Sequence, residues 1–179
     1  TESGRTMVIQ DAQDRVIAHC CRASRKDLRN AVESARKALP GWWARDAYNR
    51  GQILYRIAEM AESRATELAD AIRAVPDLRT GRRATAAQAR AEVARSTDRL
   101  VSFAGWCDKY PQVVGCQNPV SGPYHDFTMP EPTGVCVALA PEFPTLLGLV
   151  SVIAPMLAGG NVVVALASGR NPLPAMTLA

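Results

Sequence analysis

The sequence lacks the cysteine and histidine spacings that hold zinc. Its five cysteines include no C-x-x-C pair, and the chain has only two histidines. The cysteines are Cys20, Cys21, Cys107, Cys116 and Cys136. An odd number without regular spacing argues against a disulfide framework and favours free thiols in a reducing compartment. We therefore expect a cytoplasmic protein without a metal site.

Long apolar segments are also missing. The longest apolar stretch, Leu146–Ala158, contains Gly148, Ser151 and Pro155, and it is too short to span a bilayer. Residues 1–10 hold no apolar core of the kind found in a signal peptide. We therefore expect a soluble protein that has neither a membrane segment nor a signal peptide.

Clustered positive charge, which nucleic-acid-binding domains commonly carry, is absent as well. The net charge of +4 and the pI of about 9.0 arise from basic residues spread through helical stretches with acidic neighbours. The one dense run, Arg79, Arg82 and Arg83 around Gly81, is typical of a solvated loop, and its alternative is an anion site. The composition therefore predicts no nucleic-acid partner.

The first forty residues carry a strand pattern and then a helix pattern. Residues 6–18 predict a short β-ribbon, two apolar runs joined by a turn. Ser24 and Asp27 form a capping-box pattern that opens a helix. Pro40 and Gly41 are expected to end that helix, because proline lacks a backbone donor and glycine favours non-helical backbone.

Apolar residues at helical spacing predict three further helices before residue 110. The expected ranges are about 47–64, 66–75 and 85–109. We interpret their apolar stripes as faces that pack in a core, not as cofactor contacts.

The composition changes after Tyr110. Five prolines and two glycines lie in residues 111–132, with short β-prone pieces such as 112–114 and 125–129 between them. Breaker residues at this density exclude a packed helix. We therefore predict a projecting hairpin or arm.

The last third predicts two parallel strands joined by a helix. Residues 134–140 and 161–166 are nearly all apolar and of strand length, and residues 144–157 between them form an apolar helix candidate. Sheets usually have about four to six strands, and exposed sheet edges are association sites. We therefore predict an α/β fold whose parallel sheet is incomplete and needs further chain, or another copy, to complete it.

The order and spacing of several motifs resemble the aldehyde dehydrogenase superfamily. Residues 131–135 (EPTGV) match the entry to the first strand of the family's cofactor domain, and residues 154–161 (APMLAGGN) match the end of the following helix. Pro172-Leu173 matches the exit from the second strand, and residues 31–58 look like the family's two leading helices. The resemblance covers nearly the whole chain.

This resemblance implies an N-terminal helical segment, an incomplete Rossmann-like sheet and a projecting β-hairpin arm. It divides the chain into residues 1–110 with the β-ribbon and leading helices, residues 111–133 with the oligomerisation-type arm, and residues 134–179 with a partial dinucleotide-binding-like βαβ unit. A closer likeness is to the degenerate second module of two-module aldehyde dehydrogenases. It rests on residues 25–33, 105–110 and 146–151.

One departure from the family pattern falls where the family forms its oxyanion hole. The family's first strand ends in Pro-Trp-Asn-Phe-Pro, and its Asn donates a hydrogen bond to the developing oxyanion. This chain reads Pro141-Glu142-Phe143-Pro144, which is one residue shorter. A carboxylate at Glu142 would repel the developing charge. Pro141, Glu142 and Phe143 are therefore degenerate positions.

A second departure falls where the family binds the adenosine ribose. The family's Lys aligns with Leu166, and the Glu that shares its task aligns with Gly169. Ser168 and Arg170 keep polarity nearby without supplying the same groups. The family's glycine-rich turn, nucleophilic Cys and general-base Glu would follow Ala179. We therefore expect no catalytic residue, no confident cofactor-binding residue and no bound cofactor in this chain.

The other residues that could carry chemistry are interpreted as packing residues or as too far from the cofactor region. Cys136 lies in a predicted buried strand, where cysteine is usually a small hydrophobic residue. Cys20 and Cys21 follow His19, but this candidate Cys–His pair would lie far from the cofactor region of the fold. The three tryptophans are interpreted as packing anchors.

Three functions remain open. The first is a non-catalytic aldehyde dehydrogenase-like module with a structural or oligomerisation role, whose partner is another copy or a catalytic aldehyde dehydrogenase module. The alternative is the N-terminal portion of an NAD- or NADP-dependent aldehyde dehydrogenase that oxidises an aldehyde to an acid. The third is a module that binds a nucleotide at the helix start near Pro144. We favour the first, because Glu142, Leu166 and Gly169 would still be altered in a longer chain.

Overall fold

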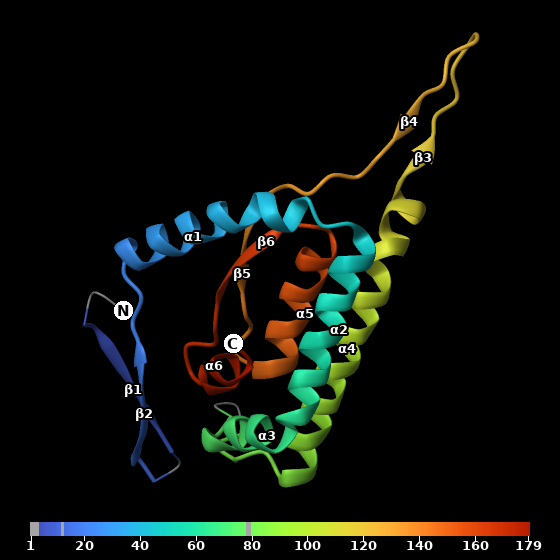
Figure 1. Ribbon diagram of the computed structural model, residues 1–179. Helices are drawn as coiled ribbons and strands as arrows, with labels where there is room; N and C mark the ends of the chain where they lie inside the picture. The colour runs from blue at the N-terminus through green and yellow to red at the C-terminus, as the bar shows by residue number, and fades with distance from the viewer. Residues whose placement is uncertain (1–3, 12, 78–79) are drawn as a thin grey trace.

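The computed structural model describes residues 4–11, 13–77 and 80–179. A β-ribbon, a set of packed helices and a long projecting arm make up the molecule (Figure 1). The elements are β1 (Thr6–Gln10), β2 (Val16–Cys21), α1 (Arg25–Trp43), α2 (Ala47–Ser63), α3 (Ala65–Ala74), α4 (Ala86–Val114), β3 (Cys116–Gln117), β4 (Phe127–Thr128), β5 (Val135–Leu139), α5 (Thr145–Ala158), β6 (Val162–Leu166) and α6 (Leu173–Leu178). The α/β fold class is as predicted. No described helix has the length and apolar character needed to cross a membrane.

Helix α1 begins as predicted and ends later. Ser24 and Asp27 form the capping box, with the Ser24 side chain and the Asp27 side chain each bonded to the other's backbone N–H. The predicted stop at Pro40 and Gly41 is wrong, because both residues lie inside the helix. A proline removes only one backbone donor, and a tertiary contact holds the last turn in place. The Trp42 indole N–H donates to the carbonyl of Leu157 at 3.3 Å.

Helices α2, α4 and α5 lie lengthwise against one another and form the core (Figure 1). Alanine is abundant where they meet, so the helix backbones approach closely. A Cβ on Gly51 of α2 would lie 3.0 Å from the carbonyl oxygen of Ala104 on α4. The main cluster of buried residues draws on α2, α3, α4 and α5. It contains Ala58, Ala61, Leu68, Ala69, Ile72, Ala89, Val93, Leu100, Leu146, Val150 and Ala154.

Helix α4 ends at Val114, not at Lys109 as predicted. Residues 111–114 of the predicted arm therefore belong to the helix. Pro111 is accommodated in the last turn because its own carbonyl still accepts from the N–H of Gly115 at 2.9 Å. A Cβ on Gly115 would lie 3.0 Å from the carbonyl oxygen of Thr128, so the returning strand β4 can come close only because this residue is glycine.

The arm beyond Gly115 projects away from the helices (Figure 1). Strands β3 and β4 pair antiparallel within it. Several of its large apolar side chains are exposed, namely Val120, Tyr124, Phe127 and Met129. The division of the chain into three parts stays a prediction.

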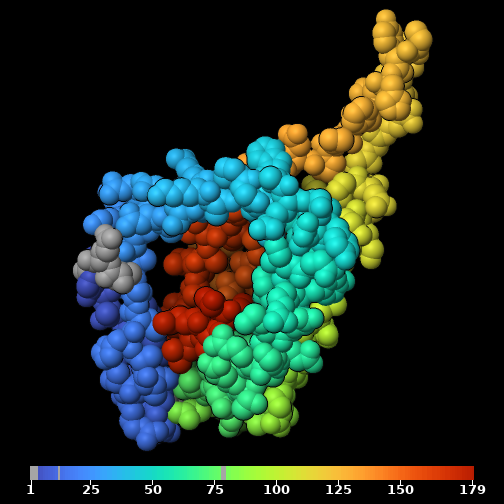
Figure 2. Space-filling view, in the orientation of Figure 1, coloured from blue at the N-terminus to red at the C-terminus, as the bar shows by residue number. Residues whose placement is uncertain are grey.

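Strands β5 and β6 form a parallel pair that is covered incompletely. Helix α5 packs against the pair, whereas Val137 and Leu139 are 55% and 69% exposed and Leu166 is 56% exposed. Figure 2 shows red atoms near the C-terminal end of the chain in a hollow framed by the ribbon, α1 and α2. The expectation of an incomplete sheet is therefore confirmed within the described residues.

The Asn161 side chain explains the Gly-Asn motif at the start of β6. Its Oδ1 accepts from the N–H of Gly134 at 2.9 Å, and its Nδ2 donates to the carbonyl of Met156 at 3.1 Å. Gly134 has a φ of 119°, in the region that favours glycine. One amide therefore ties the entry of β5 to the end of α5, and it fixes where the two strands begin.

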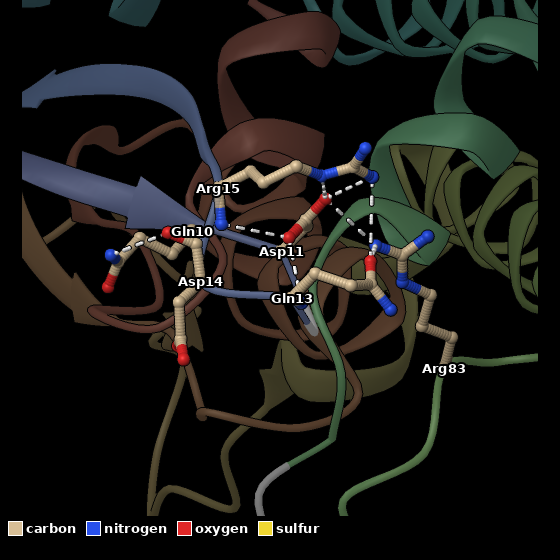
Figure 3. A network of polar contacts seen from close by, with 6 residues as sticks. All are labelled: Gln10, Asp11, Gln13, Asp14, Arg15 and Arg83. Carbon is tan, nitrogen blue, oxygen red and sulfur yellow. Dashed lines mark hydrogen bonds and ion pairs between the residues drawn. The ribbon is translucent and has the colours of Figure 1, made fainter.

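A polar cluster centred on Asp11 holds the ribbon to the loop before α4 (Figure 3). Arg15 donates to Asp11 Oδ2 from Nε at 2.8 Å, and Arg83 approaches the same oxygen at 3.4 Å. Asp11 Oδ1 accepts from the backbone N–H groups of Gln13 and Arg15. Arg83 thus takes part in an ion-pair cluster from an exposed loop, as predicted for this basic run. Arg79, which belongs to the same basic run, lies outside the described residues.

Because of this cluster, we expect the stability of the fold to decrease at acidic pH. The Arg15 hydrogen bond is the main cause that lowers the pKa of Asp11 from 3.8 to about 2. A carboxylate with a depressed folded-state pKa stabilises the fold above pH 3.8, and that stability is lost as the pH falls through about 2. We expect acidification across this window to destabilise the wild-type chain more than Asp11→Asn, which cannot titrate there.

The measurement is urea unfolding between these pH values, followed by circular dichroism. Asp14→Asn is the matched control, since Asp14 lies in the same turn and is exposed. That control retains the Asp11 cluster and should retain its acid sensitivity. Equal acid sensitivity of the wild type and Asp11→Asn would contradict the prediction.

Candidate cofactor site at the strand ends

The carboxyl ends of β5 and β6 lie at one edge of the parallel sheet. Leu139 is in register with Leu166, and the N–H of Ala140 donates to the carbonyl of Leu166 at 2.9 Å. The loops 140–144 and 167–172 therefore leave the sheet side by side. Ligands of open α/β sheets bind beyond the carboxyl ends of parallel strands, so these loops are where the sequence resemblance places catalytic and cofactor-binding groups.

The carboxylate of Glu142 joins the two loops. Its Oε2 accepts from the hydroxyl of Ser168 at 2.7 Å and from the N–H of Arg170 at 3.1 Å, and its Oε1 accepts from the N–H of Gly169 at 3.3 Å. The Ser168 hydrogen bond is the main cause that holds the pKa of Glu142 below its ordinary value, and the two backbone donors and the Arg170 charge act in the same direction. Glu142 is therefore an anion at neutral pH.

The loop 167–172 is anchored independently to α3. Ser168 is 3% exposed, and its oxygen accepts from the N–H of Asn171 at 3.2 Å. The Asn171 amide donates to the carbonyls of Ala71 and Ile72 at 3.0 and 3.4 Å, which satisfies acceptors at the C-terminus of the helix. The sequence interpretation missed Asn171. The local pattern of Ser followed by Asn-Pro, typical of side-chain-stabilised turns, is the signal that could have found it.

Of the other two degenerate positions of the first loop, Pro141 has a steric role. The ring of Pro141 lies over Gly148 of α5, where a Cβ would collide with the ring atoms of the proline. Phe143 is 48% exposed, and its peptide bond to Pro144 is cis. Neither side chain supplies a donor for an oxyanion.

Glu92 of α4 caps the start of α5. Its Oε1 accepts from the N–H groups of Leu146 and Leu147 at 2.9 and 3.3 Å, and Glu92 is 5% exposed. Pro144, the residue that precedes the helix, makes no side-chain cap. Two donors of this helix start are therefore satisfied by protein, which argues against a phosphate there. The sequence interpretation missed Glu92. Its signal is a carboxyl group at helical spacing within the apolar stripe of a long helix that also carries Asp98 and Asp108.

The residues present at the altered positions do not fit a dinucleotide held in the family's way. Leu166 presents an exposed aliphatic side chain where a ribose hydroxyl needs a hydrogen-bonding group. A Cβ on Gly169 would lie 3.4 Å from Glu142 Oε1, so a Glu in this position would face a second carboxylate. A second carboxylate at this position would therefore be disfavoured by the charge of Glu142.

A cavity of about 340 Å³ opens beside these loops. Apolar atoms dominate its walls, and its polar side chains come from the two loops, α5 and the segment after α3. It is lined by Ile72, Val75, Pro76, Asp77, Ala84, Glu142, Phe143, Thr145, Arg170 and Asn171. Its volume lies at the lower end of ligand sites. No cysteine or histidine lines it among the described residues.

The two fully buried cysteines, Cys20 and Cys107, are not activated as nucleophiles. Burial raises the pKa of the Cys20 and Cys107 thiols, which favours the unreactive protonated form. His19 and Cys20 are consecutive in β2, so their side chains point to opposite faces of the ribbon, whereas Cys21 shares the face of His19. Cys136 is half-buried, not fully buried as its strand predicts. The described part of the chain contains no group of three or more His, Cys, Asp or Glu side chains that could hold a metal ion.

Comparisons with known proteins agree with this architecture. The mitochondrial aldehyde dehydrogenase of Sus scrofa is 36% identical over 168 residues, which cover 92% of this chain and 30% of that protein. An aldehyde dehydrogenase of Alternaria alternata is 34% identical over 175 residues, covering 96% of this chain and 33% of that protein. The chain therefore spans about a third of the length of these relatives.

Solved structures give the same result. A putative aldehyde dehydrogenase from Burkholderia cenocepacia superposes with a TM-score of 0.89 at 27% identity, over 98% of this chain and 35% of that one. PnpE in complex with nicotinamide adenine dinucleotide superposes with a TM-score of 0.87 at 26% identity, with the same coverage. The profile of the aldehyde dehydrogenase family matches residues 1–179. Since sequence profile, relatives and architecture agree from one end to the other, the chain belongs to the aldehyde dehydrogenase family.

Proposed function

We propose that this chain is a non-catalytic aldehyde dehydrogenase module with a structural role, similar to the degenerate second module of two-module aldehyde dehydrogenases. The observation that carries the proposal is Glu142. An anion fixed by Ser168 and two backbone N–H groups stands at the position that the sequence resemblance assigns to the family's oxyanion donor. Leu166 and Gly169 support the same conclusion, because neither supplies a side-chain group for a ribose hydroxyl.

The structural role consists of assembly through the arm. Strands β3 and β4 project from the helices and expose apolar side chains such as Tyr124, Phe127 and Met129, which are 75%, 56% and 68% exposed. Extended segments of this kind add to exposed sheet edges of a partner. The proposed partner is another copy of the chain or a catalytic aldehyde dehydrogenase module, and neither nucleic acid nor membrane is involved. We also propose a cytoplasmic location, from the free cysteines.

A calorimetric titration of the purified chain with NAD and with NADP tests the proposal. We expect no saturable heat with either nucleotide at concentrations up to about 1 mM, which corresponds to a binding free energy weaker than about −4 kcal/mol. Light scattering on the same sample should show an oligomer that persists after each titration. Saturable binding would overturn the non-catalytic assignment, and a compact monomer would overturn assembly between copies of this chain.

A second candidate is the N-terminal portion of an NAD- or NADP-dependent aldehyde dehydrogenase. The observation that favours it is the likeness to PnpE, whose structure contains NAD. Saturable nucleotide binding in the same titration would support this candidate. It would also require that groups other than Leu166 and Gly169 hold the adenosine ribose.

A further inference from the structure

Residues 168–170 present three hydrogen-bond donors to a single carboxylate. The donors are the hydroxyl of Ser168 and the consecutive N–H groups of Gly169 and Arg170. Successive backbone N–H groups that converge in this way form a concave anion site. The positive charge of Arg170 also favours an anion there.

The donors are held in place without help from the carboxylate. Ser168 is buried, and its oxygen accepts from the N–H groups of Arg170 and Asn171 at 3.3 and 3.2 Å. The Asn171 amide is bonded to the last carbonyls of α3. The loop therefore keeps its shape through contacts that do not involve Glu142.

The carboxylate reaches this site from a separate loop. Glu142 lies 26 residues before Ser168, and it is exposed to solvent whereas Ser168 is buried. Removing the Glu142 side chain would therefore leave the three donors facing solvent. Gly169 has no side chain that could fill the space left behind.

We infer that residues 168–170 form a carboxylate-binding site that Glu142 occupies as an internal ligand. The tethered carboxylate excludes external anions from this end of the sheet. A small free carboxylate takes its place when the side chain of Glu142 is shortened. The inference does not depend on whether the chain is catalytic, because it concerns only the loops 140–144 and 167–172.

Thermal unfolding of Glu142→Ala in sodium acetate, compared with sodium chloride of equal ionic strength, tests the site. With a dissociation constant of about 10 mM, about 100 mM acetate should raise the Tm of Glu142→Ala by about 3–6 °C relative to chloride. The wild-type chain and Glu131→Ala, which removes another exposed glutamate, should show no such difference. Equal Tm values of Glu142→Ala in the two salts would overturn the inference. An equal rise in phosphate would overturn the carboxylate class of the ligand.

Glu142→Gln provides an independent test if Glu142→Ala does not fold. Glutamine keeps the shape of the side chain and removes its charge, so the charge-assisted hydrogen bonds from Gly169 and Arg170 should weaken. We expect the amide proton resonances of these two residues to move upfield, and those of residues around Glu131 to stay in place in this variant. Unchanged Gly169 and Arg170 resonances would show that the carboxylate is not bound by the loop.

Discussion

Replacing Leu100 by alanine is expected to lower the free energy of unfolding by about 3–5 kcal/mol, in the upper part of the range for buried leucines. Leu100 is 1% exposed and belongs to the cluster formed by α2, α3, α4 and α5. Five of the eleven buried residues of that cluster are alanines. The cost of a cavity depends on how far its surroundings collapse. Alanine side chains cannot swing into the space, so the cavity should persist.

Urea unfolding followed by circular dichroism measures this loss. Val101→Ala is the matched control, because Val101 is the next residue of the same helix and is 42% exposed. It should cost less than about 1 kcal/mol. Leu100→Met keeps the volume of the side chain and should cost less than about 1.5 kcal/mol. A loss for Leu100→Ala no larger than that for Val101→Ala would contradict this account of the core.

The fold could be predicted where local signals decide it. The capping box of Ser24 and Asp27 is set by residues three apart, so it is visible in the sequence and present in the structure. The prediction that α1 ends at Pro40 was wrong, because the Trp42 indole N–H donates to the carbonyl of Leu157, a residue 115 positions away, and this contact holds the last turn. The prediction that α4 ends at Lys109 was wrong, because Pro111 removes only one backbone hydrogen-bond donor from the last turn of the helix. Element types were therefore predictable, whereas two helix ends depended on contacts or compensations that no local pattern displays.

The strand-end site was predictable in position but not in structure. Sequence alignment points to Glu142, Leu166, Ser168 and Gly169, because two apolar strands and their spacing mark where the loops must leave the sheet. What the alignment does not contain is the bond from Ser168 to Glu142, which joins two separate loops. The sequence alone indicates only that a carboxylate at Glu142 would repel an oxyanion. The geometry adds that this charge is the ligand that holds the second loop to the first.

Glu92→Ala is expected to lower the free energy of unfolding by about 2–4 kcal/mol. The substitution leaves the N–H groups of Leu146 and Leu147 without their acceptor, and an unsatisfied buried polar group costs about 1–3 kcal/mol. The side chain of Pro144 cannot replace the lost acceptor. Because α5 follows the loop 140–144 directly, a loosened helix start should also disturb the position of Glu142.

Two readouts separate this local effect from general destabilisation. Urea unfolding gives the loss of stability, with Glu62→Ala on the exposed side of α2 as the matched control that should change it by less than about 0.5 kcal/mol. Amide hydrogen exchange should show lost protection at Leu146, Leu147 and Gly169 under conditions where the core of α4 stays protected. Glu92→Gln keeps a side-chain acceptor. It should therefore retain most of the stability and most of the amide protection. If Gly169 kept its protection in Glu92→Ala, the start of α5 would have no influence on the strand-end site, and the two would have to be treated as independent parts of the fold.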